Sequence, residues 1–301
     1  MIMSVSFPKI SIVTASYNQG HFIEESIQSV LNQNYPNLEY FVIDGGSTDN
    51  SVEVIQKYQQ HFTYWVSEKD RGQANAINKG LQLCTGDIFN WLNSDDYMEP
   101  GALHKIAAAF ADVQVQMVTG KVRIFSTTEE EIIANQNLTA KGLICWEPGV
   151  NFVQPGVWIR RELIAQCGGI DEKFHYAFDW DLYIRYLYSF PNVKELDDLL
   201  LHFRLHKNSK TQSLSERFSV EERKIIEKIY TLPAFINLHD TCDYKIQKEK
   251  WTKYLSEVSK KDHSFLKKVI ATVKRMRAFP RVSYTRQTAG AMKAFWVRRE
   301  I

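Results

Sequence analysis

The stretch Ile88-Phe89-Asn90-Trp91-Leu92-Asn93-Ser94-Asp95-Asp96 decides the fold of this chain. Its apolar first half predicts a buried strand, and two adjacent carboxylates follow where that strand ends. Acids at the end of a core strand need a partner, because buried charge is costly unless a cation or a hydrogen-bond donor offsets it. Mg²⁺ or Mn²⁺ is one such partner, since both prefer carboxylate oxygens and bind substrate phosphates. A solvated acid pair in a turn explains Asp95 and Asp96 about equally well.

Strands and helices alternate around this stretch. Near-continuous apolar runs predict strands at Lys9–Thr14, Tyr40–Asp44, Tyr64–Ser67 and Ile88–Leu92. Apolar residues at helical spacing predict helices between and after them, including one from Gly72 to Cys84. This alternation predicts an α/β fold with a parallel sheet and helices on both faces. Ligands of such sheets bind outside the carboxyl ends of the strands, where Asp44, Asp95 and Asp96 lie.

The later sequence is less regular. Gln116–Phe125 predicts one or two strands, Asp179–Leu187 a helix, and Leu199–Leu205 a further strand. After Ser213 the pattern is that of polar helices. We therefore expect a catalytic domain over residues 1–212 and a helical extension over residues 213–301. From His263 onward the extension is strongly basic, since its only acid is Glu300.

Composition is that of an ordinary soluble protein. Of 301 residues, 44% are hydrophobic and 24% charged, and the net charge of +2 indicates no class of partner. The four cysteines are far apart and form no CxxC pair, which argues against a disulfide framework or a structural zinc site. The start lacks a signal-peptide pattern, and no run approaches the roughly 18 apolar residues of a membrane span. We expect a cytoplasmic protein.

Two polar segments of the first half are candidate ligand contacts. Asp44, at a strand end, can accept hydrogen bonds from ribose or a base, and it can equally cap the following helix. Arg71 precedes a helix, a place that suits a diphosphate, although an ordinary charged loop explains it better. No GxGxxG follows the first strand and no GxxxxGK[ST] occurs, so dinucleotide and P-loop sites lose support.

Two residues of the second half are candidates for chemistry. Asp179 shares a helix face with Leu182 and Tyr183, whereas Asp181 points about 200° away. An acid on the inward face beside aromatic residues is a candidate general base, and a favourable interaction with the helix dipole is the simpler explanation. His206 ends an apolar strand, where it is either a structural residue or a metal ligand.

Taken in order, several segments resemble glycosyltransferase family 2, the inverting enzymes of the GT-A fold. They cover roughly residues 9–212. The segments are Ile12–Gly20, Val42–Ser51, Ser67–Gln73, Asn78–Gly80, Trp91–Asp96, Gln154–Gly156, Gly168–Asp171, Phe178–Leu182 and Arg204–Lys210. Each match alone is weak, and their joint order is specific.

The resemblance implies roles for individual residues. Residues 1–110 would bind a nucleoside-diphosphate sugar and residues 111–212 the acceptor, with Asp179 as catalytic base. The nucleotide pocket would comprise Thr14, Ser16, Tyr17, Asp44, Arg71, Asn93 and Asp95. Mn²⁺ or Mg²⁺ would be held by Asp95, Asp96 and His206. The acceptor or sugar pocket would include Gln154, His175 and Trp180.

The chain departs from the family pattern at two positions. Family members often carry an acid where Asn93 stands, and an amide there adds no charge for the metal. They also often carry an acid where Phe178 stands, which leaves Asp179 as the single base candidate.

The expected activity is transfer of a sugar, from a UDP- or dTDP-sugar, to a hydroxyl of a glycan or lipid-linked acceptor in cell-surface polysaccharide synthesis. The alternatives are a non-catalytic sugar-nucleotide-binding protein and a nucleotidyltransferase. Nucleic acid is not expected as a partner, because aromatics are sparse in the basic tail. Phe265, Val269, Ile270 and Val273 give that tail an apolar stripe, which suits either an anionic membrane surface or packing on the catalytic domain.

Overall fold

The computed structural model describes residues 7–207, 209 and 215–259. The chain divides into two compact units, residues 1–221 and residues 222–301. The predicted basic tail from His263 lies outside the described residues, as does its proposed membrane contact. Among the described residues, no helix combines the length and the apolar character needed to cross a membrane.

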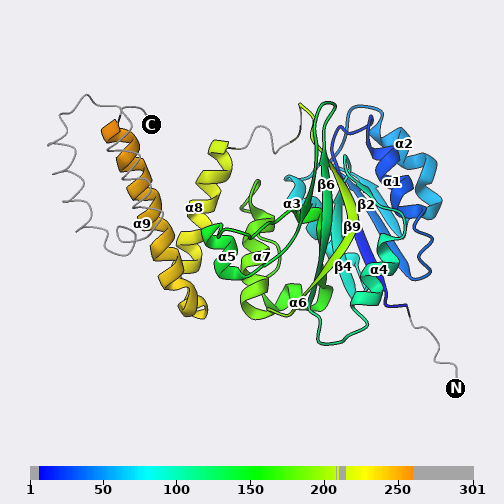
Figure 1. The fold of residues 1–301 in the computed structure, drawn as a ribbon. Coiled ribbons are helices and arrows are strands. Elements are labelled where there is room, and N and C mark those ends of the chain that lie inside the picture. Colours follow the sequence, from blue (N-terminus) through cyan, green and yellow to red (C-terminus); the bar gives the residue numbers. More distant parts are fainter. Residues whose placement is uncertain (1–6, 208, 210–214, 260–301) are drawn as a thin grey trace, which may run out of the picture. The chain divides into compact units, whose positions relative to one another are not determined.

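Within the described part of the first unit, nine strands form one sheet in the spatial order β3-β2-β1-β4-β8-β6-β9-β5, with β7 beside β6 (Figure 1). The strands are β1 (Ile10–Ser16), β2 (Leu38–Asp44), β3 (Tyr64–Ser67), β4 (Ile88–Asn93), β5 (Tyr97–Met98), β6 (Met117–Phe125), β7 (Glu130–Ala134), β8 (Val157–Arg160) and β9 (Val193–Arg204). Strands β1 to β4 are mutually parallel, as predicted. Strand β8 is antiparallel to both β4 and β6, whereas β9 runs parallel to β6.

Helices cover both faces of the sheet, which confirms the predicted α/β class (Figure 1). They are α1 (Ile23–Leu31), α2 (Ser51–Tyr58), α3 (Gln73–Leu83), α4 (Ala102–Ala109), α5 (Ala140–Cys145), α6 (Arg161–Gln166) and α7 (Phe178–Ser189), with 3₁₀ turns η1 (Gln59–His61) and η2 (Gln154–Gly156). Alternation along β1 sets the two faces: Ile10 and Ile12 join the core with α1, while Val13 meets α3. A Cβ at Gly80 of α3 would lie 2.6 Å from Val13, so only glycine permits this approach.

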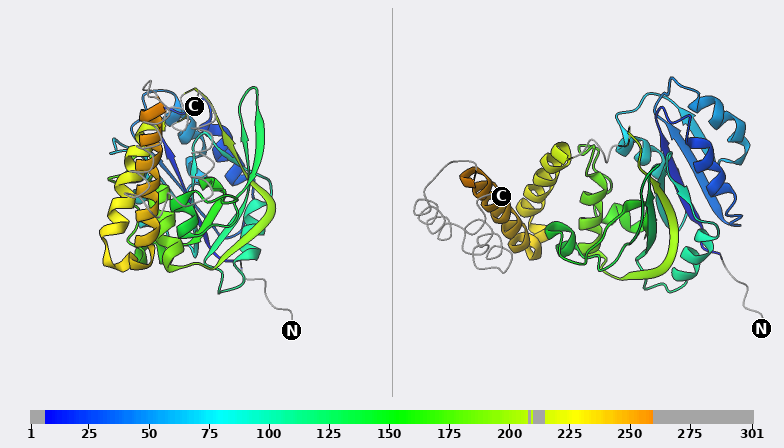
Figure 2. Two further views of the ribbon diagram at one scale, coloured as in Figure 1. Left: turned by 60° about the vertical axis from the view of Figure 1, so that its left-hand side comes forward. Right: turned by 45° about the horizontal axis from the view of Figure 1, so that its top comes forward.

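Strand β9 is longer than predicted. It begins at Val193, whereas the sequence pattern indicated Leu199. Its first half is rich in charge and half exposed, so it lacks an apolar signal. Lys121 of β6 and Asp197 of β9 form an ion pair across the two strands at 2.5 Å. Register shifts between β6 and β9 lie at residues 119–122, and β9 (yellow-green) is strongly curved in both views of Figure 2.

The second unit is helical, as predicted after Ser213. It contains most of α8 (Ser215–Thr231), the 3₁₀ turn η4 (Pro233–Phe235) and α9 (Ile236–Ser259). Its buried side chains include Ile225, Ile229, Leu238, Cys242 and Trp251. Apolar burial between the helices therefore gives this unit a core of its own.

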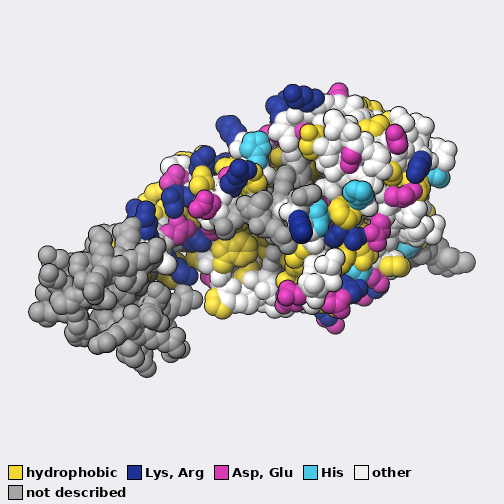
Figure 3. Space-filling model, turned by 90° about the horizontal axis from the view of Figure 1, so that it is seen from above, with side chains coloured by type: hydrophobic (Ala, Val, Ile, Leu, Met, Phe, Trp, Pro, Cys, Tyr) yellow, Lys and Arg dark blue, Asp and Glu magenta, His cyan; other side chains and the backbone are white. Residues whose placement is uncertain are grey.

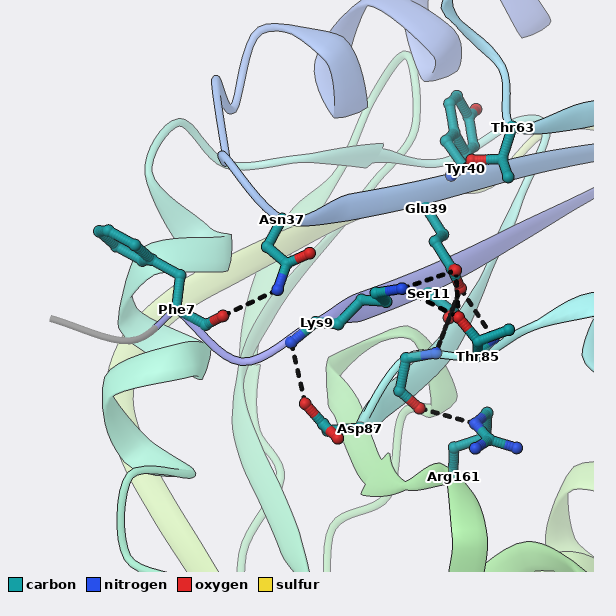
Figure 4. Close-up of polar contacts among 11 residues, drawn as sticks. Phe7, Lys9, Ser11, Asn37, Glu39, Tyr40, Thr63, Thr85, Asp87 and Arg161 are labelled. Carbon is teal, nitrogen blue, oxygen red and sulfur yellow. Dashed lines mark hydrogen bonds and ion pairs between the residues drawn. The ribbon is translucent and has the colours of Figure 1, made fainter. Parts of the chain in front are cut away.

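A partly buried carboxylate ties three strands together at their amino ends (Figure 4). Glu39 of β2 accepts hydrogen bonds from Ser11 Oγ at 2.7 Å and from the backbone N–H of Thr85 at 2.8 Å, and it also receives the Thr85 hydroxyl. Lys9 lies 3.3 Å from the same carboxylate. Burial raises the pKa of Glu39, but these hydrogen bonds outweigh burial and lower the pKa to about 2.

Glu39→Gln should therefore destabilise the first unit. The folded-state pKa lies below the ordinary 4.5, so the stabilisation is full above pH 4.5 and is lost as pH falls toward 2. At about 1.4 kcal/mol per pKa unit, the loss at neutral pH should be about 3.5 kcal/mol at most. Denaturant unfolding at pH 7 and pH 3 checks this. The difference between variant and wild type should shrink at pH 3, and a pH-independent difference would contradict the assignment.

Candidate active site

The strand register brings polar side chains to one edge of the sheet. Ser16 at the end of β1 pairs with Asp44 at the end of β2, and Asp44 pairs with Ser67 at the end of β3. On the other side, Ala15 of β1 pairs with Asn93 of β4. Seen from above in Figure 3, acidic, basic and His side chains are interspersed on this face. Three residues of the predicted nucleotide pocket, Ser16, Asp44 and Asn93, therefore lie at the same edge of the sheet.

Asp44 is fully buried and is engaged by its own loop. Its carboxylate accepts hydrogen bonds from the backbone N–H groups of Gly46 at 3.1 Å and Ser47 at 2.8 Å, and from the Ser47 and Ser67 hydroxyls at 2.5 and 2.7 Å. Four donors fill the ordinary capacity of a carboxylate. In this conformation Asp44 shapes the loop after β2, and its contact with a base stays a prediction.

The predicted nucleotide contacts at and after the end of β1 are Thr14, Ser16 and Tyr17, and they differ in exposure. Thr14 is buried, and its hydroxyl lies 3.0 Å from the Tyr40 hydroxyl. Ser16 is buried at the site edge, and its Oγ has no hydrogen-bond partner among the described residues. Tyr17 is exposed. Of these three side chains, that of Tyr17 is therefore the one accessible to a ligand.

Arg71 stands before α3 and is paired with an acid that the sequence analysis did not single out. Its guanidinium donates to Glu172 at 2.7 Å, yet its side chain is 76% exposed. Glu172 also accepts from Asn75 and Asn78, each at 3.0 Å. Burial raises the pKa of Glu172, but these hydrogen bonds and Arg71 outweigh it, so the net shift is downward. An exposed ion pair contributes little stability, so Arg71 can exchange Glu172 for a phosphate.

Asp96 is a structural acid at the end of β4. Only 1% exposed, it accepts from the backbone N–H of Arg204 at 3.0 Å and from the Asn93 amide at 2.8 Å. The Asn93 oxygen in turn accepts from Gln73 at 2.7 Å. Burial, and then the charge of Asp95, raise the pKa of Asp96 well above its ordinary value. Asn93 therefore donates to a carboxylate where an acid would have repelled it.

Asp95 has a different partner. Its carboxylate lies 3.0 Å from Nε2 of His206, and the two side chains are 18% and 17% exposed. The His206 ring packs on Phe22, with 4.7 Å between ring centroids. Arg204 Nε holds the Asp95 carbonyl at 3.1 Å, which fixes the turn to β9.

The structure does not assemble the predicted trio of metal ligands. Among the described residues, no group of three or more His, Cys, Asp or Glu side chains is placed to hold a metal. Asp95 and His206 lie together, but both oxygens of Asp96 are engaged by protein donors. A carboxylate and an imidazole still fit Mn²⁺ or Mg²⁺, because such ions fill their remaining positions with water and substrate phosphate.

Asp179 stands in the first turn of α7, partly exposed, with Oδ1 accepting from the Trp180 N–H at 2.7 Å. The inference that Asp181 faces outward is wrong. Asp181 is fully buried and pairs with Arg185, whose guanidinium also binds the carbonyls of Cys167 and Gly169. Helix α7 is covered nearly all round, so helical spacing alone did not separate its exposed from its buried acid.

The residues predicted for the acceptor or sugar pocket differ in burial. Gln154 is buried and donates to Asn90 at 3.0 Å, and Trp180 is buried with its indole N–H on the Leu143 carbonyl at 3.2 Å. His175 is exposed and lies beside Gly72, before α3. Trp146 is a further residue near this group, and the sequence did not indicate it. Its ring stacks parallel to that of Trp180, with 6.3 Å between ring centroids, and it is 40% exposed. Its backbone adopts the left-handed conformation, with φ at 48°.

Residues 11–169, just over half of the chain, match the sequence model of glycosyl transferase family 2. The chain belongs to this family. It is 26% identical over 250 residues to an uncharacterized glycosyltransferase of Nostoc sp., covering 76% of this chain and 74% of that protein. It is 27% identical to chondroitin synthase of Escherichia coli over 59% of this chain, although it spans only 26% of that protein.

Solved structures share the fold of this family 2 member. S. aureus TarS in complex with UDP-GlcNAc superposes with a TM-score of 0.63 at 17% identity, covering 90% of this chain and 82% of that chain. A mannosyltransferase of Pyrobaculum calidifontis, in complex with GDP-Man and Mn²⁺, gives a TM-score of 0.61 at 16% identity, over 98% and 88% of the two chains. The family and the GT-A fold confirm the resemblance seen in the sequence, and the family makes this protein a transferase.

The two adjacent acids should differ in their effect on metal binding. If Asp95 is a metal ligand, Asp95→Asn should lower the Mn²⁺ affinity of the UDP-loaded protein by more than about 100-fold, because the substitution removes one negative charge. Asp96→Asn should cost less, about 10-fold, the lower end of the roughly 10- to 100-fold range for residues that only support ligands. Calorimetric titration of Mn²⁺ in the presence of UDP measures both. Equal losses in two folded variants would show that Asp96 also binds the ion.

Proposed function

We propose that this protein is a metal-dependent inverting glycosyltransferase that moves a sugar from a UDP- or dTDP-sugar to a hydroxyl of a glycan or lipid-linked acceptor in cell-surface polysaccharide synthesis. The observation that carries the proposal is the pairing of Asp95 with His206 at the carboxyl ends of the sheet. Both side chains are partly open, at the edge where sheets of this kind bind ligands.

The donor would lie along the ends of β1, β2 and β4. The exposed ring of Tyr17 is available to a base or ribose, and the exposed guanidinium of Arg71 to the diphosphate. The UDP-GlcNAc complex of the similarly folded TarS supports a uridine nucleotide. Polysaccharide synthesis is supported by the relationship to chondroitin synthase.

Asp95 and His206 would hold Mn²⁺ or Mg²⁺, and the bound ion would supply positive charge against the leaving diphosphate. Arg71 adds positive charge on the same side. A nucleoside diphosphate is already a good leaving group, so charge stabilisation can replace a general acid.

The transfer is a single displacement. As the acceptor oxygen forms its bond to the anomeric carbon, Asp179 takes the hydroxyl proton. The bond from that carbon to the diphosphate oxygen breaks, and its electron pair leaves with the nucleoside diphosphate. One displacement inverts the anomeric centre. Positioning of the two substrates supplies much of the acceleration.

The acceptor would approach Asp179 past Gln154, His175 and Trp180. Trp146 covers Trp180 and keeps part of its own ring exposed, which suits the apolar face of a sugar.

The protein would work in the cytoplasm, peripherally at the inner face of the membrane. The four cysteines, all among the described residues, form no disulfide bond, which is compatible with a reducing compartment. Membrane contact would be made by the basic tail.

A donor screen tests the substrate class. Calorimetry with Mn²⁺ should show binding of UDP- or dTDP-sugars in preference to GDP- and ADP-sugars. Slow hydrolysis of the bound donor would exclude a protein that only binds sugar nucleotides. Tight binding with no turnover, in the presence of Mn²⁺ and candidate acceptors, would instead support that alternative.

Asp179→Asn tests the base. We expect kcat for transfer to fall about 10²- to 10⁴-fold, the usual contribution of a general base, while donor affinity stays within twofold. Initial rates with the donor from the screen measure this. Asp197→Asn, the same change at an exposed site on β9, serves as the control. Near wild-type transfer by Asp179→Asn would remove Asp179 from the mechanism.

A further inference from the structure

The segment that leads into α7 is held by an acid from another helix. Residues 175–177 precede Phe178, where α7 begins, and Asp179 is the second residue of the helix. The N-cap Ala177 makes no side-chain cap hydrogen bond. Helix starts are ordinarily capped by a nearby Ser, Thr, Asp or Asn, so this start depends on support from elsewhere.

Glu221 of α8 supplies that support. Its carboxylate accepts hydrogen bonds from the backbone N–H groups of His175 at 2.9 Å, Tyr176 at 2.8 Å and Ala177 at 2.9 Å. The side chain is buried, and a buried carboxylate needs donors to offset its lost hydration. Three N–H groups at the positive end of a helix provide that offset and hold the carboxylate in one place.

Two further side chains of α8 reinforce the contact. Arg217, one helical turn before Glu221, lies over the Tyr176 ring at 5.6 Å and donates to its hydroxyl. Phe218 packs on Trp180, with 6.2 Å between ring centroids. The contacts of α8 thus reach residues on both sides of Asp179. All of these residues belong to the first unit.

We propose that Glu221 is a positioning residue for the transfer reaction, because its carboxylate fixes the 175–177 backbone and thereby the place of Asp179. This inference rests on the proposed function of Asp179. Both carboxylate oxygens of Glu221 accept hydrogen bonds from this backbone. Its effect is on the alignment of the base with the acceptor hydroxyl, and a displacement of about 1 Å there can cost roughly 10²-fold in rate.

Glu221→Gln is the test. The amide keeps the size of the side chain but loses the charge and one acceptor oxygen. We expect kcat with UDP-glucose or UDP-N-acetylglucosamine, whichever the wild type turns over faster, to fall about 10- to 100-fold. The affinity for UDP with Mn²⁺ should stay within twofold. Amide hydrogen exchange should accelerate at residues 175–177 and stay unchanged in β1 and β2.

Glu216→Gln is the matched control, since Glu216 is an exposed acid on the same helix, and it should behave as wild type. Glu221→Asp keeps the charge but is one methylene too short to reach all three N–H groups, so its kcat should lie between those of wild type and Glu221→Gln. If Glu221→Gln does not fold, Glu221→Asp decides the matter alone.

Two results would overturn the inference: a kcat within twofold of wild type in the folded variant, or a loss of UDP affinity as large as the loss of kcat. Failure of the proposed function looks different. In that case the wild type turns over no nucleotide sugar, and the exchange rates at residues 175–177 still report whether Glu221 holds this segment.

Discussion

One buried carboxylate orders the end of β4 and the turn that follows it. Asp96 is enclosed at the end of β4, where the backbone of Arg204 and the amide of Asn93 each donate to it. A buried acid without such donors would destabilise the fold, so the turn, strand β9 and Asn93 are constrained together. Whereas Asp96 is buried, its neighbour Asp95 is partly exposed and lies beside His206. The contacts of Asn93 with Gln73 and with Asp96 belong to this arrangement.

The same constraint explains the departure at Asn93. Judged from sequence, an amide in place of an acid weakens a metal site by one charge. In the folded protein, Asn93 instead links Gln73 on α3 to Asp96. An acid at this position would face the Asp96 carboxylate, and two like charges in a buried site repel each other. The substitution therefore suits a site in which Asp96 is part of the framework.

Helix α7, which carries Asp179, is positioned in a different way. Helix α7 is buried nearly all round, and contacts with other segments fix its position. Its own Arg185 donates to the Cys167 and Gly169 carbonyls after α6, and Glu221 of α8 accepts from the backbone N–H of Ala177 at its start. The two acids near the start of α7 consequently differ in burial and in partner. Asp181 is neutralised by Arg185, whereas Asp179 stays partly exposed. Helical spacing predicts which side chains point in different directions around the helix. Which of those directions is buried depends on the segments that pack against the helix.

The sequence by itself determined the alternation of strands and helices, the family, and the strand ends at which the polar residues gather. It could do so because apolar runs and their periodicity are local signals, and because the family segments occur in a fixed order. Only the tertiary structure decided which of two adjacent acids is buried, that Glu172 engages Arg71, and that Glu221 supports the start of α7. Those pairings join residues that are far apart in sequence, and burial is a property of the packed neighbours of a side chain rather than of its place in the chain.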